Sequence, residues 1–296
     1  MNLSSIQSSR TTNVSAWGRL TLGIVLLTIP LLSNADTSVT NNTAETKVAS
    51  QQVSLHADWQ TLLSQHIKVI DNGHSTAVDY AAIQRQQTLL QRYLKKLSQV
   101  SRSKFDAWSK SKQLAFLINA YNAWTVEFIL TKYPDLESIK DLGNLFNSPW
   151  DKEFIPLLGK IVSLNDIEHG LIRGSGRYND PRIHFAVNCA SIGCPALREE
   201  AYTADKLEQQ LTEQTERFLS DTSRNYIRIN NLYLSSIFKW YGDDFEVGFR
   251  NAKSIQSFIL LYADVLKLTD KQKSALVKQD LNIKFLDYDW NLNVAQ

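Results

Sequence analysis

Apolar residues recur every three or four positions over much of the chain after about residue 55, which predicts amphipathic helices. The repeat runs over 59–70, begins again over 89–97 and continues through a longer segment, 105–133, that Pro134 terminates. We therefore expect two helices followed by a long one. Asn119 and Asn122 stand three residues apart inside the otherwise apolar long helix.

The second half of the chain mixes shorter patterns. Alternating residues predict strands over 160–162, 182–188 and 283–290, and a hairpin in which Asn230-Asn231 joins two alternating runs. Helical spacing returns over 207–219, 254–266 and 270–279, and Ser163-Leu-Asn-Asp166 is a capping box that opens a short helix. The predicted fold is a single helix-rich α+β domain with a small, mostly antiparallel sheet.

The first residues have the composition of a targeting segment. Arg10 and Arg19 precede an apolar run over 20–32, and Ser33-Asn34-Ala35 supplies the small residues that signal peptidase requires. The run is shorter than the roughly 18 residues of a spanning helix, so an uncleaved anchor is the weaker alternative. We expect a signal peptide over 1–35, a flexible linker over 36–55 and the domain over 56–296, in an exported protein, periplasmic or secreted, without a stable membrane span after cleavage.

Charge is nearly balanced along the chain. Lys and Arg number 32 against 30 Asp and Glu, a net charge of +2, and the two signs are interspersed. Nucleic-acid binding needs a concentrated basic face, so no nucleic-acid partner is expected. We predict no cofactor.

The most informative segment is Arg182–Pro195, because it contains His184 and both cysteines of the chain. In the predicted strand, Asn188-Cys189 stands at the carboxyl end, where the chain leaves the sheet. Cys194-Pro195 has the pattern of a helix start with proline at the first position, and the partial positive charge there favours a thiolate.

Three interpretations of the cysteines remain open. A Cys189–Cys194 disulfide requires the loop to fold back, which Gly193 permits, and contributes about 2 kcal/mol in the loop-entropy model. In thiol catalysis, either cysteine attacks an acyl carbon and a histidine takes the proton, oriented by an amide or carboxylate. A tetrahedral zinc site is the third. The candidate catalytic residues are Cys189, Cys194, His184, His169, Glu168, Asn119 and Asn122; the zinc ligands would be both histidines and both cysteines of this set.

Other polar residues around the motif are candidates for substrate binding. Arg173, Arg182 and Arg198 have the chemistry to hold a carboxylate or phosphate, although surface ion pairing is the more common role of such arginines. Adjacent helical residues lie about 100° apart, so Glu168 and His169 are not expected to pair with each other. The candidate substrate-binding residues are Asn188, Arg182, Arg173 and Ser191. The carboxylates of Asp243-Asp244 and Asp287-x-Asp289 are more typical of solvated loops than of an acid–base pair or a metal site.

Five ordered strings resemble motifs of the domain of unknown function 547 family. The strings are Ala115–Ala123 (AFLINAYNA), Ser163–His169 (SLNDIEH), Arg182–Pro195 (RIHFAVNCASIGCP), Phe238–Tyr241 (FKWY) and Tyr288–Asn293 (YDWNLN). The resemblance spans roughly Trp59 to Asn293. It implies that Asn119, Asn122, Glu168, His169, His184, Asn188, Cys189, Ser191 and Cys194 occupy motif positions of that family, and it implies no activity.

Together these patterns favour an exported hydrolase or acyl transferase that uses cysteine and histidine on a peptide-like or acyl substrate. The alternative is a non-catalytic envelope binding or scaffold module with a Cys189–Cys194 disulfide, and a second alternative is a structural zinc site. The expected partner is an unknown small-molecule or peptide-like ligand.

Overall fold

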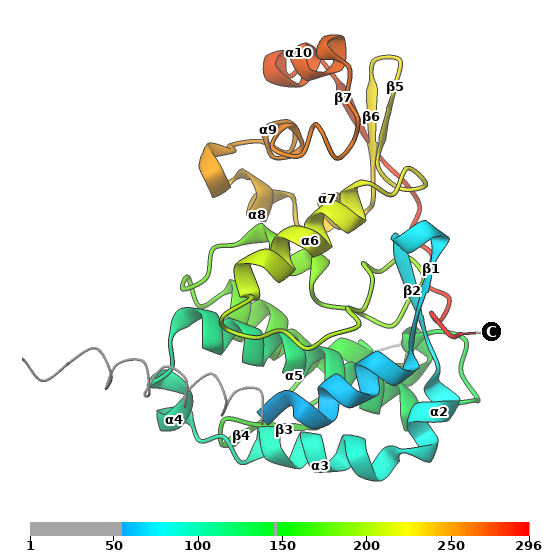
Figure 1. Ribbon diagram of the computed structural model, residues 1–296, viewed down its shortest axis with the longest axis vertical. Helices are drawn as coiled ribbons and strands as arrows, with labels where there is room; N and C mark the ends of the chain where they lie inside the picture. Colours follow the sequence, from blue (N-terminus) through cyan, green and yellow to red (C-terminus); the bar gives the residue numbers. More distant parts are fainter. Residues whose placement is uncertain (1–54, 145–146, 296) are drawn as a thin grey trace, which may run out of the picture.

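A computed structural model describes residues 55–144 and 147–295 of the chain. The predicted signal peptide lies outside the described residues, as does the predicted linker except for its last residue. Figure 1 shows a larger helical body below a smaller lobe that carries the last sheet and helices. The described part is rich in helix with three short sheets in place of one, so the predicted α+β class is confirmed.

The described chain begins with a helix over 55–66 and an antiparallel hairpin. The helix predicted over 59–70 is therefore too long, because its last four residues form the first strand. Three of those four residues are β-branched, and a turn with Asn72 and Gly73 at positive φ closes the hairpin. The elements here are β1 (Ile67–Ile70), the 3₁₀ turn η1 (Asp71–Gly73), β2 (Ser75–Val78), α2 (Tyr80–Arg85) and α3 (Gln87–Ser98).

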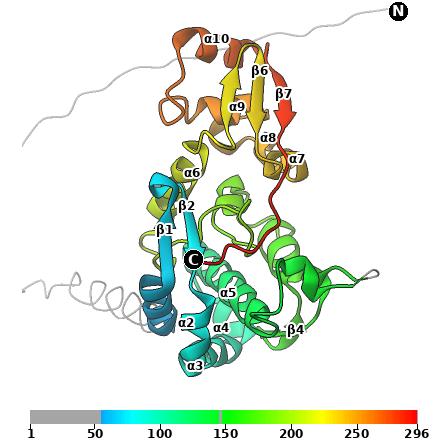
Figure 2. The ribbon, with the colours of Figure 1, turned by 90° about the vertical axis from the view of Figure 1, so that its right-hand side faces the viewer.

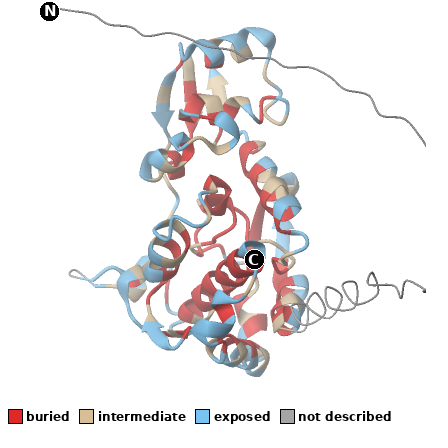
Figure 3. Cartoon of the chain, turned by 90° about the vertical axis from the view of Figure 1, so that its left-hand side faces the viewer, coloured by how far each residue is buried: buried red, intermediate tan, exposed pale blue. Residues whose placement is uncertain are grey.

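The segment predicted as one long helix is two helices, α4 (Arg102–Asp106) and α5 (Lys110–Leu130). Ser109 separates them, because its hydroxyl accepts a hydrogen bond from the amide of Lys112 at 3.3 Å and caps the second helix. Nearly every residue of α5 is buried, and Figure 3 shows this helix crossing the interior of the body. Its polar side chains must therefore find partners inside the protein.

Short elements follow α5 and lead into the site. They are η2 (Ile139–Leu142), η3 (Pro149–Asp151), the hairpin of β3 (Ile155–Leu157) and β4 (Lys160–Val162), and the π-helix η4 (Asp166–Arg173). The predicted strand over 160–162 and the predicted capping box are both confirmed. The amide of Asp166 donates to the Ser163 hydroxyl at 3.0 Å, and the amide of Ser163 donates to the Asp166 carboxylate at 2.8 Å.

The strand predicted over 182–188 is wrong, because this segment begins with a 3₁₀ helix, η5 (Pro181–Phe185). Asp180 caps that helix by accepting from the amide of Arg182 at 3.0 Å, and Pro181 occupies its first position. All residues over 181–188 are buried. Alternation of residue types therefore does not separate a buried face from an exposed one here.

The helix predicted to begin at Cys194-Pro195 is also wrong, and the next helix is α6 (Leu207–Leu219). Side-chain amides donate hydrogen bonds to the backbone carbonyl groups that would accept from backbone amides in a helix. Asn188 donates to the carbonyl of Pro195 at 2.7 Å, and Gln214 donates to the carbonyl of Ala196 at 2.8 Å. The segment after the second cysteine is therefore fixed as an irregular, buried loop.

The smaller lobe contains a three-stranded sheet in the order β5-β6-β7, with the first pair antiparallel and the second parallel. The predicted hairpin is confirmed, and the predicted last strand is shorter than expected. The lobe has its own apolar cluster, separate from that of the body. Its elements are β5 (Tyr226–Arg228), β6 (Asn231–Leu234), α7 (Ile237–Trp240), α8 (Gly242–Glu246), η6 (Phe249–Asn251), α9 (Ile255–Leu260), α10 (Asp270–Lys278) and β7 (Asn282–Phe285).

After β7 the chain returns from the lobe to the body, as the red segment of Figure 2 shows. We call residues 286–295 the return segment. Leu292 forms a bridge with Ser191, and Val294 forms one with Val78 of β2. The hydroxyl of Tyr80 donates to the Asn293 side chain at 2.7 Å. Among the described residues, no helix is long and apolar enough to cross a membrane.

Candidate active site

A pocket of about 240 Å³ lies where the two apolar clusters meet, since its lining residues come from both. Cys189, His184, Glu168 and His169 all line it, so the structure brings together the predicted sulfur, imidazole and carboxylate groups. Aromatic side chains from α5, η3, the α7 segment and the return segment form most of the remaining wall. They are Tyr121, Trp150, Trp240, Tyr241, Tyr288 and Trp290.

Cys189 and Cys194 form a disulfide, with their Cα atoms 6.1 Å apart. The turn that permits it is made by Ala190, whose φ of 63° lies in the left-handed region, and not by Gly193 as expected. Gly193 serves a different purpose. A Cβ atom at this position would stand 2.9 Å from ring carbons of Tyr288, so only glycine lets that ring pack on the loop.

His184 is buried and held on two sides. Its Nε2 lies 2.7 Å from Oδ2 of Asp244, and its ring stacks on Tyr241 with the centroids 4.0 Å apart. Burial lowers the pKa of His184, and hydrogen bonding to Asp244 opposes this only in part. A neutral imidazole donates from one nitrogen and accepts at the other. Because Nε2–H donates to the carboxylate, Nδ1 carries the lone pair.

Nδ1 of His184 has no hydrogen-bond partner and lies 3.8 Å from Oε1 of Glu168. Glu168 is itself buried; burial of the two tyrosines, and after it the charge of Glu168, raises the pKa of both Tyr121 and Tyr241. A buried nitrogen acceptor without a donor is uncommon in proteins. The pocket therefore contains a neutral base whose accepting atom is free beside a carboxylate.

Asp244 connects the neutral His184 to a cationic group, the guanidinium of Arg173. Its Oδ2 accepts from Nε of Arg173 at 2.5 Å, and Nη1 of Arg173 lies 2.6 Å from Nδ1 of His169. Burial alone would raise the pKa of Asp244, but the hydrogen bonds from His184 and Arg173 outweigh it and hold that pKa well below the usual range. Arg173, predicted to bind substrate, is thus engaged by protein groups. Glu168 and His169 face different partners, as expected.

Several other predicted site residues support the backbone around the motif. Asn119 donates to the carbonyl of Tyr202 at 2.8 Å and accepts from its amide at 3.0 Å. Asn122 donates to the carbonyl of Ala186 at 2.9 Å and accepts from the amide of Asn188 at 2.8 Å. Neither amide lines the pocket. Both hold the loops that follow η5, the role expected of buried amides with backbone partners.

Of the remaining predicted residues, Asn188 and Ser191 form hydrogen-bond contacts in the disulfide loop, and Arg182 forms buried ion pairs. Asn188 accepts from the amide of Ala190 at 2.9 Å, while the hydroxyl of Ser191 lies 3.3 Å from Sγ of Cys189. The side chain of Arg182 is 3% exposed and pairs with Asp180 and Glu208, away from the pocket lining. Arg198 likewise pairs with two glutamates.

The zinc interpretation has no geometric counterpart in the described part of the chain. No group of three or more His, Cys, Asp or Glu is placed to hold a metal ion over 55–144 and 147–295. The two sulfur atoms are bonded to each other.

Sequence reasoning missed three residues that shape the pocket. Asp244 was expected to be a solvated loop charge, yet it orients His184. Tyr241 and Tyr288 stack on the imidazole and contact the disulfide, respectively. The two tyrosines stand in strings that the family resemblance had singled out, FKWY and YDWNLN, which was the available signal.

Residues 105–219 match the model of a family described as "Protein of unknown function, DUF547". The match contains three of the five strings, and the FKWY and YDWNLN strings lie beyond it. No curated protein and no solved structure matches the chain.

Proposed function

We propose that this chain, of which residues 105–219 match the DUF547 family of proteins of unknown function, is an exported hydrolase or acyl transferase. In this proposal Cys189, in its reduced form, is the nucleophile and His184 is the base that accepts its proton. The substrate is an acyl or peptide-like group bound against the aromatic wall.

The arrangement of His184 is the observation that carries the proposal. Asp244 holds one ring nitrogen at 2.7 Å, and the other nitrogen is left without a partner in a pocket that Cys189 also lines. A carboxylate that orients an imidazole toward a nucleophile is the arrangement by which cysteine and serine enzymes activate a weak acid. Removing the thiol proton makes the thiolate that attacks the acyl carbon.

The lining of the pocket indicates the substrate class. Aromatic rings give large apolar contact at little cost in conformational entropy, and Glu168 supplies one buried acceptor for a donor such as a peptide N–H. A small acyl or peptide-like group fits a volume of about 240 Å³.

The test is labelling of the reduced, mature protein by an electrophilic thiol probe, with hydrolysis of a panel of thioesters, esters and peptides measured in parallel. We expect labelling at Cys189 that falls at least ten-fold in His184→Gln and in Asp244→Asn. Lys239→Gln, on the exposed side of α7, is the matched control and leaves the rate unchanged. Circular dichroism of each variant separates misfolding from lost reactivity. An equal rate of Cys189 labelling in the wild type and in His184→Gln overturns the proposal.

The rival function is a binding module in which the disulfide fixes one wall of the pocket. The formed Cys189–Cys194 bond and the aromatic lining favour it. It predicts that the oxidised protein binds a ligand, detected by quenching of tryptophan fluorescence, and that reduction weakens binding without producing turnover. Export is tested separately by the mass of the mature amino terminus, expected near Asp36.

A further inference from the structure

The two sulfur atoms of the disulfide differ in accessibility. Both cysteines line the pocket, but Cys189 is partly exposed whereas Cys194 is 4% exposed. Thiol–disulfide exchange requires an incoming thiolate to reach one sulfur along the axis of the bond. The greater exposure of Cys189 therefore makes it the sulfur that an incoming thiolate reaches.

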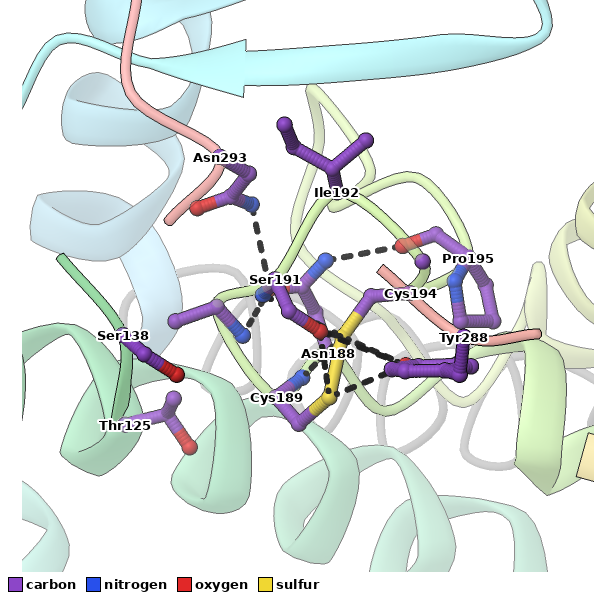
Figure 4. The surroundings of a disulfide bond; sticks show 12 residues. Thr125, Ser138, Asn188, Cys189, Ser191, Ile192, Cys194, Pro195, Tyr288 and Asn293 are labelled. Carbon is purple, nitrogen blue, oxygen red and sulfur yellow. Dashed lines mark hydrogen bonds between the residues drawn. A yellow bond between two sulfur atoms is a disulfide. The ribbon is translucent and has the colours of Figure 1, made fainter. Parts of the chain in front are cut away.

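The two sulfur atoms also differ in the donors around them. Sγ of Cys194 accepts from the amide of Cys189 at 2.9 Å and from the amide of Ser191 at 3.5 Å. The hydroxyls of Ser191 and Tyr288 lie 3.2 and 3.3 Å from the same atom. Within the described part of the chain, the hydrogen-bond contacts of Sγ of Cys189 are with these two hydroxyls only. Figure 4 shows Tyr288 beside the bond.

This asymmetry decides which sulfur leaves as an anion. Hydrogen bonds to a charged acceptor are stronger than those to a neutral one, so negative charge is more stable on Cys194 than on Cys189. Arg224 adds support, because its Nη1 donates to the carbonyls of Gly193 and Cys194 at 3.2 and 3.1 Å and fixes the loop. The leaving sulfur keeps its donors when the bond breaks.

We propose that a small thiol enters the pocket and exchanges with the disulfide, attacking at Cys189 and expelling Cys194. The incoming thiolate forms a new bond to Sγ of Cys189 while the bond between the two protein sulfurs breaks, and Cys194 takes the electron pair as a thiolate. A second small thiol then attacks the sulfur of the first one. It releases Cys189 as a thiolate and leaves as a small-molecule disulfide, so the protein gains two electrons and two thiols are oxidised.

The size of the pocket favours a small thiol over a protein dithiol. About 240 Å³ enclosed by Trp150, Trp240 and Trp290 admits a cysteine-sized group or a short thiol peptide. The freed Cys189 then stands in the same pocket as His184. Exchange would thus switch on the acyl chemistry, and this consequence rests on the proposed function, whereas the exchange step itself does not.

The experiment uses oxidised mature protein and glutathione, with acid quenching and mass analysis of peptides. We expect a mixed disulfide on Cys189. In Cys194→Ser, oxidised glutathione should modify Cys189 readily; in Cys189→Ser, modification of Cys194 should be at least ten-fold slower. A mixed disulfide found mainly on Cys194 overturns the proposal, and so does reduction by a protein dithiol but not by glutathione.

Tyr288→Phe tests the role of the donors. It keeps the ring but removes one donor to the leaving thiolate, and should slow reduction by glutathione roughly three- to ten-fold. Tyr233→Phe, in β6 and stacked on Tyr226, is the control and should not change the rate. Equal rates for the wild type and Tyr288→Phe would contradict the assignment. If glutathione exchanges at Cys189 but labelling of Cys189 by the thiol probe does not depend on His184, this inference stands and the proposed acyl chemistry is rejected.

Discussion

Replacing Asp244 by Asn is the most direct test of the polar network behind the pocket. The change keeps the shape of the side chain and one acceptor oxygen, but it removes the charge that faces His184 and Arg173. The side chains of Arg173 and Asp244 are 26% and 27% exposed, so solvent screens their ion pair and its loss costs less than about 1 kcal/mol. The hydrogen bond from buried His184 weakens from a charge-assisted to a neutral one, a further loss of roughly 1 kcal/mol.

The expected total is a decrease of about 1 to 2 kcal/mol in the free energy of unfolding. For a domain of this size it corresponds to a fall in Tm of about 2 to 8 °C. Urea unfolding followed by tryptophan fluorescence and a calorimetric scan measure the two quantities. Asp243→Asn is the control, because Asp243 is exposed and should change stability by less than about 0.5 kcal/mol.

The difference in stability between wild type and Asp244→Asn should also depend on pH. The folded-state pKa of Asp244 lies below its ordinary value of 3.8, so its contribution to stability is complete above that pH and is lost as the pH falls further. The difference between wild type and Asp244→Asn should therefore be full at pH 7 and shrink below about pH 4. Equal stability of the two proteins at pH 7, or a difference that grows in acid, would refute this account of the network.

Three further predictions concern stability. Reducing the disulfide should cost about 2 kcal/mol, measured as the shift of the urea midpoint with and without reductant, and an unchanged midpoint would show that the loop is held by its hydrogen bonds alone. Burial lowers the pKa of His56 from 6.5 to about 3, so stability should fall as the pH drops below 6.5, by about 3 kcal/mol at pH 4.5. His56→Gln should not show this loss of stability between pH 7 and pH 4.5, measured by urea titration at the two pH values. Gly193→Ala should lower stability by roughly 1 to 3 kcal/mol in the same assay, because its Cβ meets a ring at 2.9 Å, whereas Gly170→Ala meets nothing within 4 Å and should not.

The sequence predicted elements well where one face of an element is exposed or where a cap marks its start. The β5–β6 hairpin and the capping box at Ser163 are examples. It failed over 182–188, where every residue is buried and alternation therefore carries no information about faces. The cap formed by Asp180 and Pro181 was readable from the sequence and would have indicated a helical turn.

The site was predictable only in its local part. His184 and Cys189 are five residues apart, so their shared pocket could be expected from the chain itself. Asp244 and Tyr288 come to the pocket through the packing of the smaller lobe and the path of the return segment, which no local pattern encodes. Asp243 and Asp244 are adjacent and identical in type, yet one is exposed and the other orients a base.

The path of the return segment has a consequence for biosynthesis. Tyr288 and Trp290 come after all the other pocket-lining residues in the chain and are therefore synthesised after them, and the bridges of Leu292 and Val294 join the return segment to a strand and a loop made much earlier. A nascent chain can therefore build both apolar clusters while one side of the cavity is still missing. The pocket is therefore complete only once residue 290 has been made, and a chain truncated before residue 286 would retain its cysteines and histidines in a pocket that lacks the aromatic side chains of Tyr288 and Trp290.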